Sequence, residues 1–77
     1  MKRDDFTHEF AEMLGIDPAQ LLPETDLASL PEWDSVAYLS AMVLIDDKLA
    51  IAIRPDIISS ARTFADILAA ISSALRD

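Results

Sequence analysis

Three prolines between positions 17 and 34 prevent this chain of 77 residues from folding as one long helix or as helices joined by tight turns. Pro18, Pro23 and Pro31 each remove a backbone donor and fix φ, which excludes a continuous helix through this segment. A loop of this length in a compact domain is either functional or disordered. Disorder is disfavoured because four of its residues are leucines that a solvated linker does not need: Leu21, Leu22, Leu27 and Leu30. We therefore expect the loop to be pinned across the core.

The segment before the loop has the spacing of an amphipathic helix. Its apolar positions recur at i, i+4, i+7 and i+8, and are Phe6, Phe10, Met13 and Leu14. Asp4 or Asp5 can cap its start. Gly15 is the one glycine in the chain and suits the left-handed position that ends a helix. We expect the helix to end there, with Ile16 folding back onto its last turn.

A second helix is predicted from Asp34 or Ser35 to about Leu49. One face carries Val36, Leu39 and Val43, but other apolar residues cover most of the circumference. A helix that is apolar all round is either central or covered by something. Because so small a domain cannot enclose it, part of this helix is expected to be a docking surface, made of Ala37, Tyr38, Ala41 and Met42. The alternative for Tyr38 and Met42 is an ordinary place in the core or at its boundary.

Two further helices are predicted toward the C-terminus. Residues 50–54 are expected to be an irregular connection, after which Pro55 can open a short helix. Thr63 can cap the last helix while Asp66 reaches back to it, as in a capping box. The apolar stripe of that helix is Phe64, Ile67, Leu68, Ile71 and Leu75. The fold class is therefore all-α: one domain over residues 1–77, a small four-helix bundle with three main helices, a short third helix and a long loop between helices 1 and 2.

The charge of the chain restricts its partners. Fourteen acidic and six basic residues give a net charge of −8, and no Lys or Arg occurs between Arg3 and Lys48. Nucleic acids and anionic membrane surfaces should repel such a chain, whereas basic protein surfaces should attract it. The alternative is that the acidic residues only keep the protein soluble.

The sequence predicts a soluble, cytoplasmic monomer. Acidic residues follow Met1-Lys2-Arg3, where a secretory signal would have an apolar region. The uncharged run 36–45 is shorter than the roughly 20 residues that span a bilayer. The lack of cysteine fits a reducing compartment.

Few residues could carry catalysis. Nucleophilic catalysis by Ser35 needs a base, and the one histidine, His8, lies opposite the apolar stripe of its helix. Asp17, Glu24 and Asp26 lack the ligand spacing of a calcium loop. A single glycine is too few for a phosphate-cradling loop. We therefore expect a protein that is not an enzyme and holds no metal.

Ser35 has two interpretations that follow from its place at the start of the uncharged helix. Its hydroxyl can be an N-cap that satisfies free N–H groups. It can also be an attachment point for a phosphate group, which the positive field of a helix N-terminus favours.

The second interpretation is strengthened by a resemblance to the acyl carrier proteins, which covers almost the whole chain. The resemblance is carried by the acidic, leucine-bearing loop and by Trp33-Asp34-Ser35-Val36, Leu39, Val43, Leu49, Ile53 and Pro55. In that family a serine at the head of the second helix of a four-helix bundle receives 4′-phosphopantetheine from coenzyme A. The resemblance implies that Ser35 is the attachment residue, with Asp34 the acid beside it and Val36 in place of the usual leucine. It also implies that acyl or aminoacyl groups are carried as thioesters between enzymes.

The partners that the resemblance implies are a phosphopantetheinyl transferase, an acyl- or aminoacyl-loading enzyme, and a downstream transferase or synthase. Carriers of primary fatty acid synthesis resemble one another in an acid-rich second helix, but here acids return only at Asp46 and Asp47. We therefore expect a dedicated partner with a more apolar interface, in a specialised pathway such as polyketide, peptide or surface-polymer assembly. The residues expected to recognise partners are Asp34, Val36, Ala37, Tyr38, Ala41, Met42, Asp46 and Asp47.

Two alternatives accompany this interpretation. The chain can instead be an unmodified helical interaction module, in which Ser35 is a helix cap and the Tyr38–Met42 surface binds a partner. Trp33 can be a mark of free-standing carriers of specialised pathways, or an anchor that holds the loop over the core.

Overall fold

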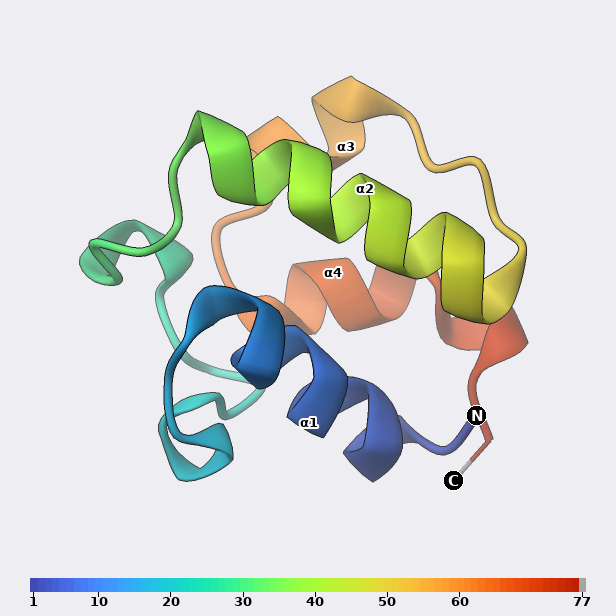
Figure 1. The fold of residues 1–77 in the computed structure, drawn as a ribbon, viewed down its shortest axis with the longest axis horizontal. Coiled ribbons are helices and arrows are strands. Elements are labelled where there is room, and N and C mark those ends of the chain that lie inside the picture. The colour runs from blue at the N-terminus through green and yellow to red at the C-terminus, as the bar shows by residue number, and fades with distance from the viewer. Residues whose placement is uncertain (77) are drawn as a thin grey trace.

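The computed structural model describes residues 1–76, which form four α-helices and three short 3₁₀ turns (Figure 1). The helices are α1 (Arg3–Leu14), α2 (Ser35–Leu49), α3 (Pro55–Ser60) and α4 (Phe64–Ala70). The 3₁₀ turns are Pro18–Gln20, Leu27–Ser29 and Ser72–Ala74. None of the residues from 1 to 76 belongs to a β-strand, so the predicted small all-α fold is confirmed.

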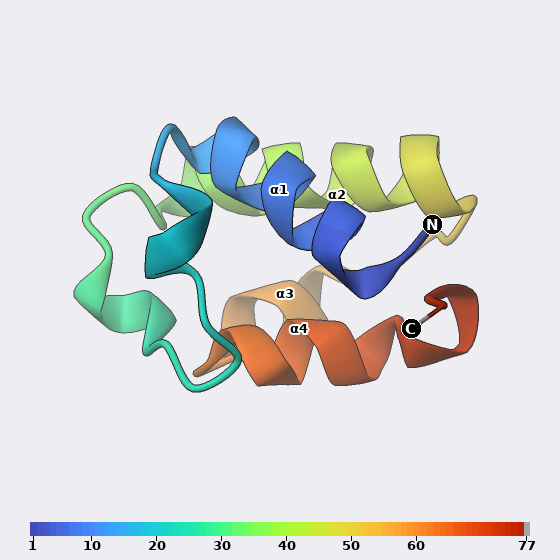
Figure 2. The ribbon, with the colours of Figure 1, turned by 90° about the horizontal axis from the view of Figure 1, so that it is seen from below.

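The helices lie in two layers. Figure 2 shows α1 beside α2 in one layer and α3 with α4 in the other. The two ends of the chain meet at one end of the bundle, where the Arg3 N–H donates to the Arg76 carbonyl at 3.0 Å and the Arg76 N–H donates to the Met1 carbonyl at 2.9 Å. The loop between α1 and α2 occupies the opposite end (Figure 1). Ser35 therefore lies at the loop end of the molecule.

An aromatic cluster joins the helices to the loop. The ring centroid of Phe10 lies 5.8 Å from that of Phe6, 5.1 Å from that of Phe64 and 5.6 Å from that of Trp33. These separations are in the favourable range for aromatic pairs. Three of these rings are among the largest fully buried side chains of the core, which are Phe6, Phe10, Phe64, Leu27, Ile45, Ile58, Ile67 and Ile71.

The predicted end of the first helix is confirmed. Gly15 has a φ of 75°, the left-handed conformation that glycine adopts without a steric cost. Its N–H donates to the Glu12 carbonyl at 3.1 Å, and the Ile16 N–H donates to the Ala11 carbonyl at 3.0 Å. Ile16 packs against the core, as expected for a residue that folds back onto the last turn.

The loop is held to the start of α4 by backbone hydrogen bonds. The Leu27 N–H donates to the Arg62 carbonyl at 2.9 Å, and the Phe64 N–H donates to the Thr25 carbonyl at 3.1 Å. Leu21 and Leu27 are buried and Leu30 is half-buried. Leu22 was expected to pin the loop as well, but its side chain is 52% exposed, so this expectation is wrong. Leu21 is only 2% exposed, so one leucine of this pair enters the core and the next one faces the surface.

The capping box predicted at the start of α4 is present. Asp66 Oδ2 accepts hydrogen bonds from the N–H groups of Arg62 at 2.9 Å and Thr63 at 3.2 Å. These hydrogen bonds lower the pKa of Asp66 below its ordinary value of 3.8, and the bond from the Arg62 N–H has the largest effect. The Asp66 carboxylate is thus fixed at the start of α4, where the backbone of the loop is also hydrogen-bonded.

This capping carboxylate gives a pH prediction. Because the pKa of Asp66 is lower in the folded chain than in the unfolded chain, its contribution to stability is complete above the unfolded value near 3.8. The contribution is lost as the pH falls through the lower, folded value. In urea unfolding we expect a steeper loss of stability below about pH 4 in the wild-type chain than in Asp66→Asn. Equal slopes in the two proteins would contradict a stabilising role for this carboxylate.

The last helix is shorter than its apolar stripe suggested. It ends at Ala70, and a 3₁₀ turn at Ser72–Ala74 carries the chain on to Leu75. Serines compete for backbone hydrogen bonds and favour turns and helix ends, which accounts for the change after Ile71. Ile71 is nevertheless buried, and Leu75 still packs against the core.

Candidate functional site

Ser35 is the first residue of α2, and its neighbours fix its position. Asp34 is the N-cap, because its Oδ1 accepts a hydrogen bond from the Ala37 N–H at 2.9 Å. Trp33 is 9% exposed, and its ring centroid lies 4.9 Å from that of Tyr38 as well as 5.6 Å from that of Phe10. Trp33 therefore anchors the end of the loop to α1 and α2, as one of its two interpretations predicted.

The hydroxyl of Ser35 has no structural task within the described chain. Ser35 is exposed, and within residues 1–76 its Oγ makes no hydrogen bond. The interpretation of Ser35 as the helix cap is therefore wrong: Asp34 takes that role because its extended backbone (φ −123°, ψ −173°) directs its carboxylate at the first turn. Ser35 is held in place by its neighbours while its own oxygen stays available.

This division of roles can be tested by stability. Asp34→Ala should lower the free energy of unfolding by about 1 kcal/mol, because the Ala37 N–H loses its acceptor. Ser35→Ala removes an exposed hydroxyl that bonds to no residue in the range 1–76 and should cost less than about 0.5 kcal/mol. Chemical denaturation of both variants measures the difference. A larger loss of stability for Ser35→Ala than for Asp34→Ala would contradict this assignment and identify Ser35 as the capping residue.

The start of α2 also offers backbone donors beside the hydroxyl. Within residues 1–76 the N–H groups of Ser35 and Val36 have no acceptor, whereas those of Ala37 and Tyr38 are bonded to Asp34. Two unpaired N–H groups and the positive end of the helix dipole favour an anion at this point. A phosphate group on Ser35 Oγ would fit this environment, although the carboxylate of the adjacent Asp34 would oppose its charge.

The expected docking surface on α2 has to be corrected. Ala37 and Ala41 are 7% and 0% exposed, so the expectation that they face a partner is wrong. Positions 37, 41 and 45 lie on one face of a 3.6-residue helix, and that face is turned into the bundle, where α2 packs against α1 and α3. Tyr38 and Met42 are half-buried and pack at the edge of the core, which is the alternative proposed for them.

The exposed apolar face of α2 lies on the other side, and Val36 is the one member of it that the sequence analysis named as a partner residue. We call it the outer stripe: Val36, Leu39 and Val43, which are 69%, 64% and 67% exposed. It begins beside Ser35 and runs along α2 toward Asp46 and Asp47, which are both exposed. The spacing showed that the three residues share a face, but only the packing shows that this face is outward. Of the expected partner residues, Asp34, Val36, Asp46 and Asp47 are at the surface.

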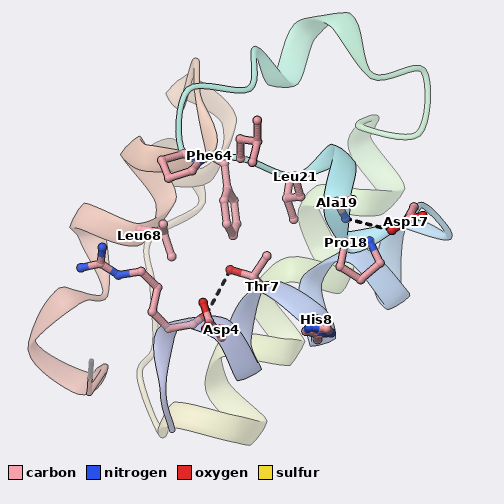
Figure 3. A pocket seen from close by; sticks show the side chains of 12 residues that line it. Asp4, Thr7, His8, Asp17, Pro18, Ala19, Leu21, Phe64 and Leu68 are labelled. Atoms are coloured by element: carbon pink, nitrogen blue, oxygen red, sulfur yellow. Dashed lines mark hydrogen bonds between the residues drawn. The ribbon is translucent and has the colours of Figure 1, made fainter.

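Two of the hollows at the bundle surface bear on the positions of Ser35 and His8. The larger one, of about 590 Å³, lies between α1, the turn at Pro18–Gln20 and α4 (Figure 3). His8 lines it together with Asp17, whose Oδ1 accepts the Ala19 N–H at 2.9 Å. Ser35 is not among its lining residues, so this hollow does not bring the histidine to the serine. The smaller one, of about 290 Å³, adjoins the outer stripe; we call it the α2 hollow, lined by Met42, Val43, Asp46, Ala52 and Ile53.

The described residues show neither a metal cluster nor a membrane span. Within residues 1–76, no three His, Asp or Glu side chains are placed to hold a metal ion together. The helices in that range are also too short or too polar to cross a bilayer. Comparison of the sequence with protein-family models and with curated proteins gave no match.

Proposed function

We propose that this chain is a carrier protein that holds acyl or aminoacyl groups as thioesters on a 4′-phosphopantetheine arm attached to Ser35. The observation that supports this most is the state of the Ser35 hydroxyl. Asp34 caps the helix and Trp33 anchors the loop, which leaves an exposed oxygen at a fixed point with no bond to another residue in the range 1–76. A purely structural serine at this position would be expected to use its oxygen as the cap.

Attachment of the arm is a phosphoryl transfer at Ser35 Oγ. The oxygen forms a bond to the phosphorus that carries the pantetheine of coenzyme A, and the bond from that phosphorus to the 3′-phosphoadenosine 5′-phosphate leaving group breaks. The hydroxyl proton passes to a base of the transferase. The resulting phosphodiester lies at the N-terminus of α2, where the N–H groups of Ser35 and Val36 can donate to it. The bound arm supplies a thiol that this cysteine-free chain lacks.

The outer stripe is the surface that we assign to partner enzymes: a phosphopantetheinyl transferase, a loading enzyme and a downstream transferase or synthase. Three exposed aliphatic residues leading away from Ser35 fit a partner face with an apolar centre. Asp46 and Asp47 at the far end fit a basic rim on the same face. This apolar character supports a dedicated partner in a specialised pathway, and the thiol of the arm suits a reducing compartment such as the cytoplasm.

The partner surface gives a kinetic prediction. Leu39→Glu should lower kcat/KM for arm transfer by at least about tenfold, because burying a leucine in an interface is worth roughly 1.5–3 kcal/mol. Its stability should change by less than about 0.5 kcal/mol, because the Leu39 side chain is 64% exposed. Leu22→Glu is the matched control, since Leu22 is an exposed leucine outside the stripe. An equal loss of kcat/KM in Leu39→Glu and Leu22→Glu would contradict a specific role for the outer stripe.

The function itself is tested by mass. The purified chain is incubated with coenzyme A and a broad-specificity phosphopantetheinyl transferase, and the intact mass is then measured. The expected result is a gain of one phosphopantetheine group, located by peptide mapping to the peptide that contains Ser35. An unchanged mass, or a gain in another peptide, would overturn the proposal.

A second candidate function is favoured by the outer stripe alone. Three adjacent exposed aliphatic residues also suit an unmodified interaction module that binds a partner through α2. The mass experiment separates the two functions, because only the carrier gains the arm.

A further inference from the structure

A groove runs along α4 on another face of the molecule than the outer stripe. The larger hollow, between α1, the turn at Pro18–Gln20 and α4, shares Pro23 and Leu68 with a third hollow of about 220 Å³, which continues past Ala69 to Ser72. We call the two hollows together the α4 groove. Figure 2 shows α1 and α4 on the near side of the bundle and α2 and α3 behind them. No residue of the outer stripe lines the groove.

Leu22 is an apolar side chain of this groove that the core does not use. It lines the larger hollow and is 52% exposed. Its backbone is nevertheless fixed, because its N–H donates to Thr25 Oγ1 at 2.9 Å. The carbonyl of the next residue, Pro23, accepts the Ala65 N–H of α4 at 2.8 Å. A leucine that is held in place and still exposed loses little further freedom when a partner covers it, so its burial can stabilise a complex.

The wall that α4 contributes suits a helix as the partner. Ala65, Ala69 and Ser72 line the third hollow and are spaced four and three residues apart, which places them along one side of α4 and its extension. Small side chains at a contact allow two helix axes to approach closely. The stretch from Ala65 to Ser72 is about 10 Å long at 1.5 Å per residue, which matches roughly two turns of a partner helix.

The charges of the groove favour a basic partner. Asp4 and Asp17 both line it. The Asp17 carboxylate is fixed in place, because its Oδ1 accepts the Ala19 N–H at 2.9 Å while the Asp17 N–H donates to Gln20 Oε1 at 3.2 Å. Among the described residues that line the groove, Arg3 is the only lysine or arginine, so carboxylates outnumber it. Lysine or arginine side chains beside an apolar anchor would complement this arrangement.

We propose that the α4 groove binds an amphipathic helix of a second protein, with aliphatic side chains against Leu22 and basic side chains beside Asp4 and Asp17. A second copy of this chain is a poor occupant, because its exposed aliphatic face, the outer stripe, leads to Asp46 and Asp47 and would bring like charges together. This inference goes beyond the proposed function. A helix in the groove holds the protein at a fixed place while the outer stripe stays free for enzymes.

The binding test uses the full chain before the arm is attached and synthetic helical peptides of about 14 residues, or four turns, that carry a fluorescein label. The first peptide has leucines along one face and lysines on the other. The second has the same composition with the leucines spread around the helix, and the third has glutamate in place of lysine. By fluorescence anisotropy the first should bind at least about tenfold more tightly than the other two. Equal affinity of the first and second peptides would show attraction by charge alone and overturn the proposal.

Variants of the groove separate the apolar contact from the charge. Leu22→Ser should weaken binding of the first peptide about fivefold, because the exposed half of a leucine is no longer buried. Asp17→Asn keeps an oxygen for the Ala19 N–H but removes the charge, so it should weaken binding about twofold at low salt and not at about 1 M salt. Leu39→Ser, at an exposed leucine of the outer stripe, is the matched control and should bind like the wild type. Wild-type affinity in either groove variant would overturn the proposal.

The position of the bound peptide is measured by ¹H–¹⁵N correlation spectra. Binding should shift the amide signals of Thr7, Leu22 and Leu68 and leave those of Leu39 and Val43 in place. Shifts centred on the outer stripe would overturn the inference. The chain carries no arm in these experiments, so an unchanged mass in the transferase experiment would overturn the proposed function alone. Failure of the first peptide to bind would overturn the groove alone.

Discussion

Replacing Ser35 with alanine is expected to abolish attachment of the phosphopantetheine arm completely. The reaction needs an oxygen that a transferase can reach, and Ser35 provides one that is exposed and has no bond to another residue between 1 and 76. Ser40 on the same helix is half-buried, and Ser29 in the loop donates its hydroxyl to the Asp26 carbonyl at 2.6 Å. The intact mass of Ser35→Ala should therefore stay unchanged under conditions that convert the wild-type chain fully.

The matched control for this variant is Ser29→Ala, which removes another exposed serine of the same loop region. It should gain the arm to the same extent as the wild-type chain. Circular dichroism should show that Ser35→Ala is as helical as the wild type, because its hydroxyl has no structural partner within the described residues. A mass gain in Ser35→Ala would place the attachment elsewhere and end the carrier assignment.

Most local signals in this sequence predicted local structure well. The expected cap of the first helix at Asp4 or Asp5 is wrong, because α1 begins at Arg3 after Lys2 and both aspartates lie in its first turn. Gly15 ends α1, Pro55 opens α3 and Asp66 closes the capping box of α4, because each of these features depends on residues within one or two turns. Asp34 and Ser35 are both good capping residues, and the sequence left open which of them caps α2. The structure decides for Asp34, because its extended backbone brings the carboxylate to the Ala37 N–H.

The orientation of α2 could not be predicted from its sequence. Most of its circumference is apolar, so no polar side indicates which face is turned to water. The orientation of α2 is set by its contacts with α1 and α3. These contacts bury Ala41 and Ile45, so Leu39 and Val43 face outward. Two of the residues expected to form a docking surface, Ala37 and Ala41, are therefore buried, while Leu39 and Val43, which were not expected to form it, are exposed. The same limit applies to Leu21 and Leu22, where tertiary packing alone selects which leucine is buried.

Trp33→Ala is expected to cost about 3–5 kcal/mol of stability, the range for removing a large aromatic side chain from a core. A domain of this size has a total stability of roughly 4–12 kcal/mol, so the loss is a large share of it. The Trp33 ring packs between Phe10 and Tyr38, and its removal also frees the segment that leads to Ser35. Circular dichroism during heating should show a melting temperature lower by at least about 12 °C. Trp33→Phe keeps an aromatic ring in this position and should lose much less stability than Trp33→Ala. A melting temperature for Trp33→Ala within a few degrees of that for Leu22→Ala, a truncation of an exposed residue, would contradict the anchoring role.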